Sequence, residues 1–130
     1  MKTNIDIKDK VFEALNVSDV TDTIEGTLYN GKRPATKEID EDITIVPLPT
    51  DSEFVQSATI NVNCYAKDIV EGVPDYSRLN IIFGKVESAL DSYSSTEYFD
   101  IDIASQHIMD AEIKGWSFLN VRLNCKILKS

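Results

Sequence analysis

The sequence predicts an α+β protein in which a mixed, mostly antiparallel sheet of five to six strands carries two main helices on one face. Two observations lead to this prediction. In two segments the apolar residues recur at steps of three and four, which is the spacing of a helix that buries one side. Elsewhere apolar and polar residues alternate, as in a strand with one buried face. A chain of 130 residues fits one domain, which we expect to span 1–130.

The first predicted helix covers 3–15 and begins at a cap formed by Thr3 or Asn4. Its apolar stripe consists of Ile7, Val11, Ala14 and Leu15. The polar segment 16–22 then reads as a connection between elements.

Three strands are predicted next, at 24–29, 43–46 and 55–67. After the first of them, Asn30-Gly31 favours a tight turn. The segment 35–42 has no apolar period, which indicates a long exposed loop.

The second helix is expected from Asp75, its cap, to Leu90. Its apolar stripe consists of Leu79, Ile82, Phe83, Val86 and Leu90. Three more strands should follow at 98–103, 106–114 and 116–128, joined by short turns into a meander. We expect Phe83 and Val121 to be buried, because each lies in the middle of an apolar stripe.

Composition limits the classes of function. The net charge of −9 argues against a protein that grips nucleic acid, since that requires clustered Lys and Arg. No apolar run is long enough for a membrane span, and the first residues lack a secretory signal, so we expect the chain to fold in a cytoplasm. Cys64 and Cys125 lie on apolar strand faces and are predicted to be buried free thiols, without a disulfide or a metal site.

We find no constellation typical of catalysis and predict no enzymatic activity, catalytic residue, metal or cofactor. His107 is the single histidine, and its place in an alternating strand favours a structural or surface role. Acidic residues are dense in the predicted loop, but no second cluster opposes them as general acid–base chemistry would require. This acidic set consists of Glu38, Asp40, Glu41 and Asp42.

Surface residues are the remaining candidates for function. One strand presents a polar stripe of Thr59, Asn61, Asn63 and Tyr65, which suits either a solvated outer face or an interface. Tyr29, Lys32 and Arg33 combine an aromatic ring with two cations, a mixture common at interfaces.

The order of these elements, with several short phrases, resembles the small tail-completion or tail-terminator proteins of long-tailed bacteriophages and prophages. The phrases are GTLYNGKRP, EIDEDITIVPL, INVNCYAKD and DYSRLNIIFGKVESAL. The resemblance covers nearly the whole chain and implies an α+β subunit without cofactor or enzymatic activity. It also implies a homohexameric ring in the tail–neck region of the virion, assembled in the cytoplasm of the bacterial host.

Such a ring caps the tail tube, ends its polymerisation and offers a docking surface to the head–tail connector or neck protein. The implied partners are copies of the chain, the tail tube protein, the connector, and DNA that passes through the channel without specific binding; no membrane is involved. The polar stripe with Tyr29, Lys32 and Arg33 is then expected to contact neighbouring subunits or the tube. The four acidic residues of the loop would line the channel, because an acidic wall does not hold the passing duplex.

Two alternatives remain open at this point. Head-completion (neck) proteins of phages have a similar size and are the nearest confusable group. A small ligand-binding or hydrolase domain, with a pocket between helix 75–90 and the sheet, belongs to a different class of function.

Overall fold

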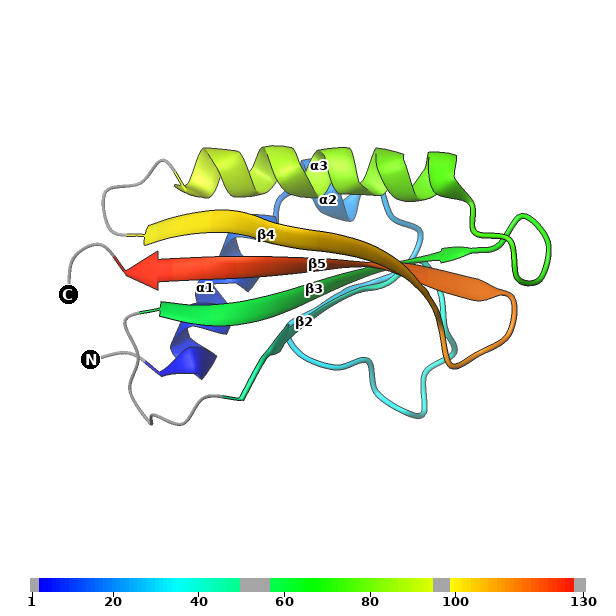
Figure 1. The fold of residues 1–130 in the computed structure, drawn as a ribbon, viewed down its shortest axis with the longest axis horizontal. Coiled ribbons are helices and arrows are strands. Elements are labelled where there is room, and N and C mark those ends of the chain that lie inside the picture. Colours follow the sequence, from blue (N-terminus) through cyan, green and yellow to red (C-terminus); the bar gives the residue numbers. More distant parts are fainter. Residues whose placement is uncertain (1–2, 50–56, 95–98, 128–130) are drawn as a thin grey trace.

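The computed structural model describes residues 3–49, 57–94 and 99–127, and within them it has the predicted α+β architecture (Figure 1). The five described strands form one sheet in the order β1-β2-β3-β5-β4. β1 runs parallel to β2, and the other neighbouring pairs are antiparallel. The elements are α1 (Asn4–Leu15), α2 (Ser18–Thr21), β1 (Leu28–Tyr29), β2 (Ile43–Pro47), β3 (Ser57–Lys67), α3 (Tyr76–Ser94), β4 (Phe99–Asp110) and β5 (Trp116–Ile127).

Both long helices begin at side-chain caps that the sequence predicts. At α1, Thr3 Oγ1 accepts a hydrogen bond from Asp6 N at 3.1 Å, and the Asp6 carboxylate accepts one from Thr3 N at 2.9 Å. This reciprocal capping box satisfies two amide groups that the helix itself leaves free. At α3, Asp75 Oδ1 accepts from Arg78 N at 3.0 Å, and the helix continues beyond the predicted end at Leu90 to Ser94.

The core lies between the sheet and the helices. β3 and β5 occupy the middle of the sheet, and the register places Val62 opposite Val121 and Ile60 opposite Leu123. These four side chains are fully buried, as predicted for Val121. The helices contribute Ile7, Val11, Ala14 and Leu15 from α1 and Leu79, Ile82, Val86 and Leu90 from α3. Burial of each large side chain contributes roughly 1.5–3 kcal/mol as an upper estimate.

Phe83 corrects one prediction, because its ring is only partly buried against the core. The stripe of α3 that faces the core runs through Leu79, Ile82 and Val86, which are spaced by three and four residues. Phe83 lies one position beyond this stripe and reaches a hollow that α3 shares with Ile108 of β4.

The two strands predicted at 98–103 and 106–114 are one strand, β4, so the sheet of the described residues has five strands, within the predicted five to six. A register shift between Ile103 and Ser105 is the cause. Before this bulge Ile101 and Ile103 share the face of the buried β5 residues, and after it Ile108 does. Because the bulge reverses the alternation of faces, the sequence pattern looks like two strands.

Two smaller elements also differ from prediction. The short helix α2 lies within the connection predicted at 16–22, and the strand predicted at 24–29 is reduced to Leu28–Tyr29. The loop predicted at 35–42 contains no strand or helix, as expected.

Cys64 and Cys125 are both free and buried, which confirms their predicted state. Cys64 lies opposite Leu119, and Cys125 lies opposite Ala58. The two positions are therefore roughly 20 Å apart along the sheet, far beyond the reach of a disulfide. Among the described helices, none is long and apolar enough to cross a membrane.

Candidate interaction surface

Among the described elements, the helices lie on one face of the sheet and leave the other face uncovered. Along β3, every second residue packs beneath the helices, while Thr59, Asn61, Asn63 and Tyr65 lie half-buried on the other side. Figure 1 shows α1 behind the strands and α3 running beside β4. We call the side of the sheet that bears Thr59 and Tyr65 the open face.

A groove of about 510 Å³ lies on the open face. One wall is the loop after β1, with Lys32, Arg33 and Ile39. The opposite wall is the end of the β4–β5 hairpin, with the range 110–113. The floor is formed by Thr44, Val46, Asn61, Asn63, Tyr65 and Phe118.

The floor of the groove is held in place by contacts between β3 and β5. The rings of Tyr65 and Phe118 lie 5.0 Å apart between centroids, at a tilted angle of 37°. Asn120 Nδ2 donates to Asn63 Oδ1 at 2.7 Å, and Arg122 Nε donates to Asn61 Oδ1 at 3.5 Å. Burial raises the pKa of the Tyr65 hydroxyl above its ordinary value, against the opposing effect of the Arg33 charge. The floor therefore offers a fixed surface of neutral polar groups and aromatic rings.

The structure brings most of the predicted contact residues together. Lys32, Arg33, Asn61, Asn63 and Tyr65 line the same groove, although the sequence separates the loop from the strand. Thr59 lies farther along the open face, in a smaller hollow of about 390 Å³. Tyr29 pairs with Thr44 of the same face across β1 and β2. The sequence did not lead us to Phe118 or to the hairpin wall. Phe118 could have been found, because it is an aromatic residue on the polar side of an alternating strand.

The four acidic residues divide into two pairs. Glu38 and Asp40 are exposed, and the structure leaves them available to solvent or to a partner. Glu41 and Asp42 are 8% and 2% exposed, so their carboxylates lie inside the subunit. The expectation that these two line a channel is corrected: both bind groups of their own chain, and Glu38 and Asp40 are the remaining candidates.

Glu41 joins the end of the loop to helix α3. Its carboxylate accepts from Arg78 Nε at 2.6 Å and from Arg78 Nη2 at 2.7 Å, a two-pronged ion pair. It also accepts from Glu25 N at 3.0 Å, while Arg78 Nη2 donates to Thr23 O at 2.6 Å. The Arg78 hydrogen bonds are the main reason that the pKa of the Glu41 carboxyl lies below its ordinary value, although burial opposes them.

Asp42 fixes the loop against the segment before β1. Asp42 Oδ1 accepts from Thr27 N at 2.9 Å, and Oδ2 accepts from Asp40 N at 3.1 Å. Gly26 is required at this crossing, because a Cβ there would overlap both Asp42 Oδ1 and the Glu41 carbonyl. The acids nearest β2 therefore anchor one wall of the groove to the body of the subunit.

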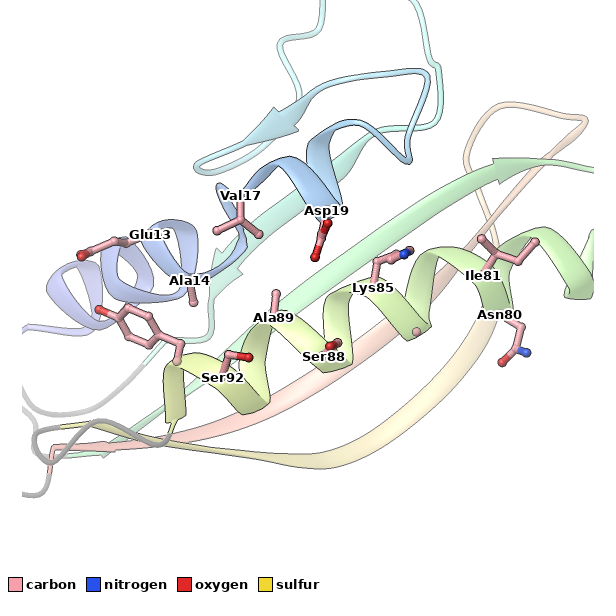
Figure 2. Close-up of a pocket in the computed structure, with 12 residues that line it drawn as sticks. Glu13, Ala14, Val17, Asp19, Asn80, Ile81, Lys85, Ser88, Ala89 and Ser92 are labelled. Carbon is pink, nitrogen blue, oxygen red and sulfur yellow. The ribbon is translucent and has the colours of Figure 1, made fainter.

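A second hollow, of about 670 Å³, lies on the helix side between α3 and the α1–α2 corner (Figure 2). Figure 2 shows Ala14, Val17 and Asp19 on one side of it and Lys85 and Ser88 of α3 on the other. This is not the pocket between α3 and the sheet that a ligand-binding domain was expected to have. Between α3 and β4 there is a smaller hollow of about 450 Å³, lined partly by Tyr76, Phe83 and Ile108.

Within residues 3–49, 57–94 and 99–127, no three His, Cys, Asp or Glu side chains form a group that could hold a metal ion. His107 is exposed on β4, opposite Asn120. Burial raises the pKa of the Cys64 thiol to about 12, which removes it as a thiolate nucleophile at neutral pH.

Comparison with known proteins adds no assignment. No protein-family model matches the chain, and no curated protein matches it significantly.

Proposed function

We propose that this chain is a structural assembly protein of a long-tailed bacteriophage, a tail-terminator or tail-completion subunit that forms a ring, caps the tail tube and joins it to the head connector. The observation that carries the proposal is the groove on the open face, which gathers Lys32, Arg33, Asn61, Asn63 and Tyr65 in one place. The resemblance of the sequence to tail-completion proteins supplies the specific role.

The groove suits a protein partner better than a small substrate. Its floor combines neutral amides with the Tyr65–Phe118 aromatic pair, and its rim carries Ile113, which is 43% exposed. Aromatic and Arg side chains beside neutral polar groups are typical of the central part of a protein–protein interface.

Charge supports a role beside DNA that does not grip it. A net charge of −9 per subunit repels the phosphate backbone, and the exposed Glu38 and Asp40 are the best placed of the loop acids to face a channel. The ring would hold its subunits together against their mutual repulsion, which salt screens over roughly 8–10 Å.

A head-completion protein of the neck is the alternative within the same class, since it would also assemble through exposed surfaces. The two roles differ in the partner: a terminator binds the tail tube protein, and a neck protein binds the portal side. Binding of the purified chain to each of these proteins separates them.

The proposed use of the open face is tested by a matched pair of substitutions. Ile113→Asp places a charge at the rim of the groove, and Ile81→Asp makes the same change on the helix side, where Ile81 is 50% exposed. We expect Ile113→Asp to lose ring formation or tube binding, measured by light scattering and co-sedimentation, while Ile81→Asp keeps both. Retention of both by Ile113→Asp would exclude the open face as the interface.

A further inference from the structure

β4 forms one edge of the sheet, and its outer side has no strand partner among the described residues. The hydrogen bond from Ala111 N to Trp116 O, at 3.0 Å, closes the β4–β5 hairpin. Hydrogen-bonded pairs alternate along an antiparallel ladder, so the N–H groups of Gln106, Ile108 and Asp110 point away from β5. Such an edge is a template for another strand, and soluble proteins usually cover or blunt it.

The opposite edge of the same sheet is β1, and its direction fits β4. β4 is antiparallel to β5, β5 to β3 and β3 to β2, while β1 is parallel to β2. β1 and β4 therefore run in opposite directions. A second copy that continues the sheet beyond β4 would present its β1 in antiparallel orientation, which is the slightly more stable pairing.

The two edges also carry opposite charge. The range 28–37 contains three basic residues and no acidic ones, and the range 99–112 contains four acidic residues and neither Lys nor Arg. Lys32 and Lys37 are exposed, and so are Asp102, Asp110 and Glu112. Within the described part of the chain, none of these five side chains forms an ion pair.

The geometry points to a head-to-tail contact in which the free edge of β4 in one subunit lies against the basic segment 28–37 of the next. This inference rests on the proposed function for the premise that copies of the chain assemble. The contact is heterologous, because two different surfaces meet, and such contacts close into rings when the rotation between copies permits. Lys32, Asp110 and Glu112 line one groove of the subunit, and within the described residues no ion pair joins them, so these charges remain for a partner.

A charge-swap experiment tests the contact on the full chain. Variant A carries Asp102→Lys and Asp110→Lys on β4, and variant B carries Lys32→Glu and Lys37→Glu on the segment 28–37. In each variant alone, the replaced side chains of one surface have the same sign of charge as the side chains that they would meet on the other surface. In an equimolar mixture, the replaced side chains of A meet those of B with opposite signs, and the unaltered β4 of B meets the unaltered segment 28–37 of A. The control, Glu87→Lys with Asp91→Lys on exposed positions of α3, changes the net charge as much as variant A does.

Assembly is measured by sedimentation velocity and native mass spectrometry. We expect A and B to be monomeric alone, their mixture to form particles of the wild-type size with equal numbers of A and B, and the control to assemble as the wild type does. Restored assembly in the mixture also shows that both variants fold. The inference is overturned if A or B alone assembles like the wild type, or if the mixture remains monomeric. If the wild type forms rings but the variants give one of these contrary results, the contact is wrong and the proposed function still stands. If the wild-type chain stays monomeric even with the tube protein, both the contact and the proposed function fail.

Discussion

The ion pair between Glu41 and Arg78 makes a direct prediction about stability. Glu41→Gln keeps the shape of the side chain but replaces a carboxylate oxygen by an amide group that cannot accept from Arg78. Hydrogen bonds to charged groups contribute about 1.5–3 kcal/mol to the free energy of unfolding. The side chain of Arg78 is 29% exposed and that of Glu41 is 10% exposed. Water therefore compensates the arginine in part, and we expect a loss of stability within that range.

The pH dependence of this loss follows from the pKa of Glu41. Arg78 lowers the pKa of the folded carboxyl below its ordinary value of 4.5, so the contribution is present above the unfolded pKa and is lost as the pH falls through the folded pKa. The difference in free energy of unfolding between wild type and Glu41→Gln should therefore be full at pH 7 and shrink below about pH 4.5.

Urea unfolding followed by circular dichroism, at a series of pH values, measures this difference. Glu38→Gln is the matched control, because Glu38 is exposed and has no hydrogen bond or ion pair within the described residues; it should change stability little. Equal stability of Glu41→Gln and wild type at pH 7 would show that the ion pair does not stabilise the fold. A loss that stays constant down to pH 3 would show that ionisation of Glu41 is not its source.

Three further predictions concern the core, the glycines and the cysteines. Leu123→Ala should cost about 2–5 kcal/mol in chemical denaturation, and Phe83→Ala should cost less than Leu123→Ala because its ring is only partly buried; the reverse order would contradict the packing. Gly84→Ala should raise the melting temperature, since a Cβ there meets nothing within 4 Å and Ala favours a helix over Gly by about 0.5–1 kcal/mol. Gly26→Ala should lower the melting temperature, because its Cβ would overlap the Glu41 backbone. Cys64 and Cys125 should not react with Ellman's reagent at pH 8 in the folded protein, because burial raises the pKa of both thiols to about 12. Both thiols should react in denaturant. Rapid labelling without denaturant would show that the core opens.

The elements with uninterrupted periodicity could be predicted from the sequence. The stripe of α3 and the alternation along β3 and β5 each follow from the spacing of apolar residues, and the caps at Thr3 and Asp75 follow from local hydrogen-bonding chemistry. β4 could not be predicted as one strand, because its bulge shifts the alternation between Ile103 and Ser105.

The candidate surface was predictable in part. Asn61, Asn63 and Tyr65 share a face by simple alternation, but only the tertiary structure brings the 110–113 hairpin wall opposite Lys32. The role of Glu41 depended on Arg78, which lies 37 residues away in the sequence. A dense run of carboxylates in a loop resembles a solvated patch, and no local pattern tells which of them find a buried partner.

We propose that copies of this chain assemble into a closed ring that caps a tail tube. Electron microscopy of the purified chain, alone and mixed with a tail tube protein of a long-tailed phage, is the decisive test of this proposal. We expect rings with a central channel, and tubes that end in such a ring and stop growing once it is bound. Single subunits in both samples, with tubes that continue to grow, would contradict it.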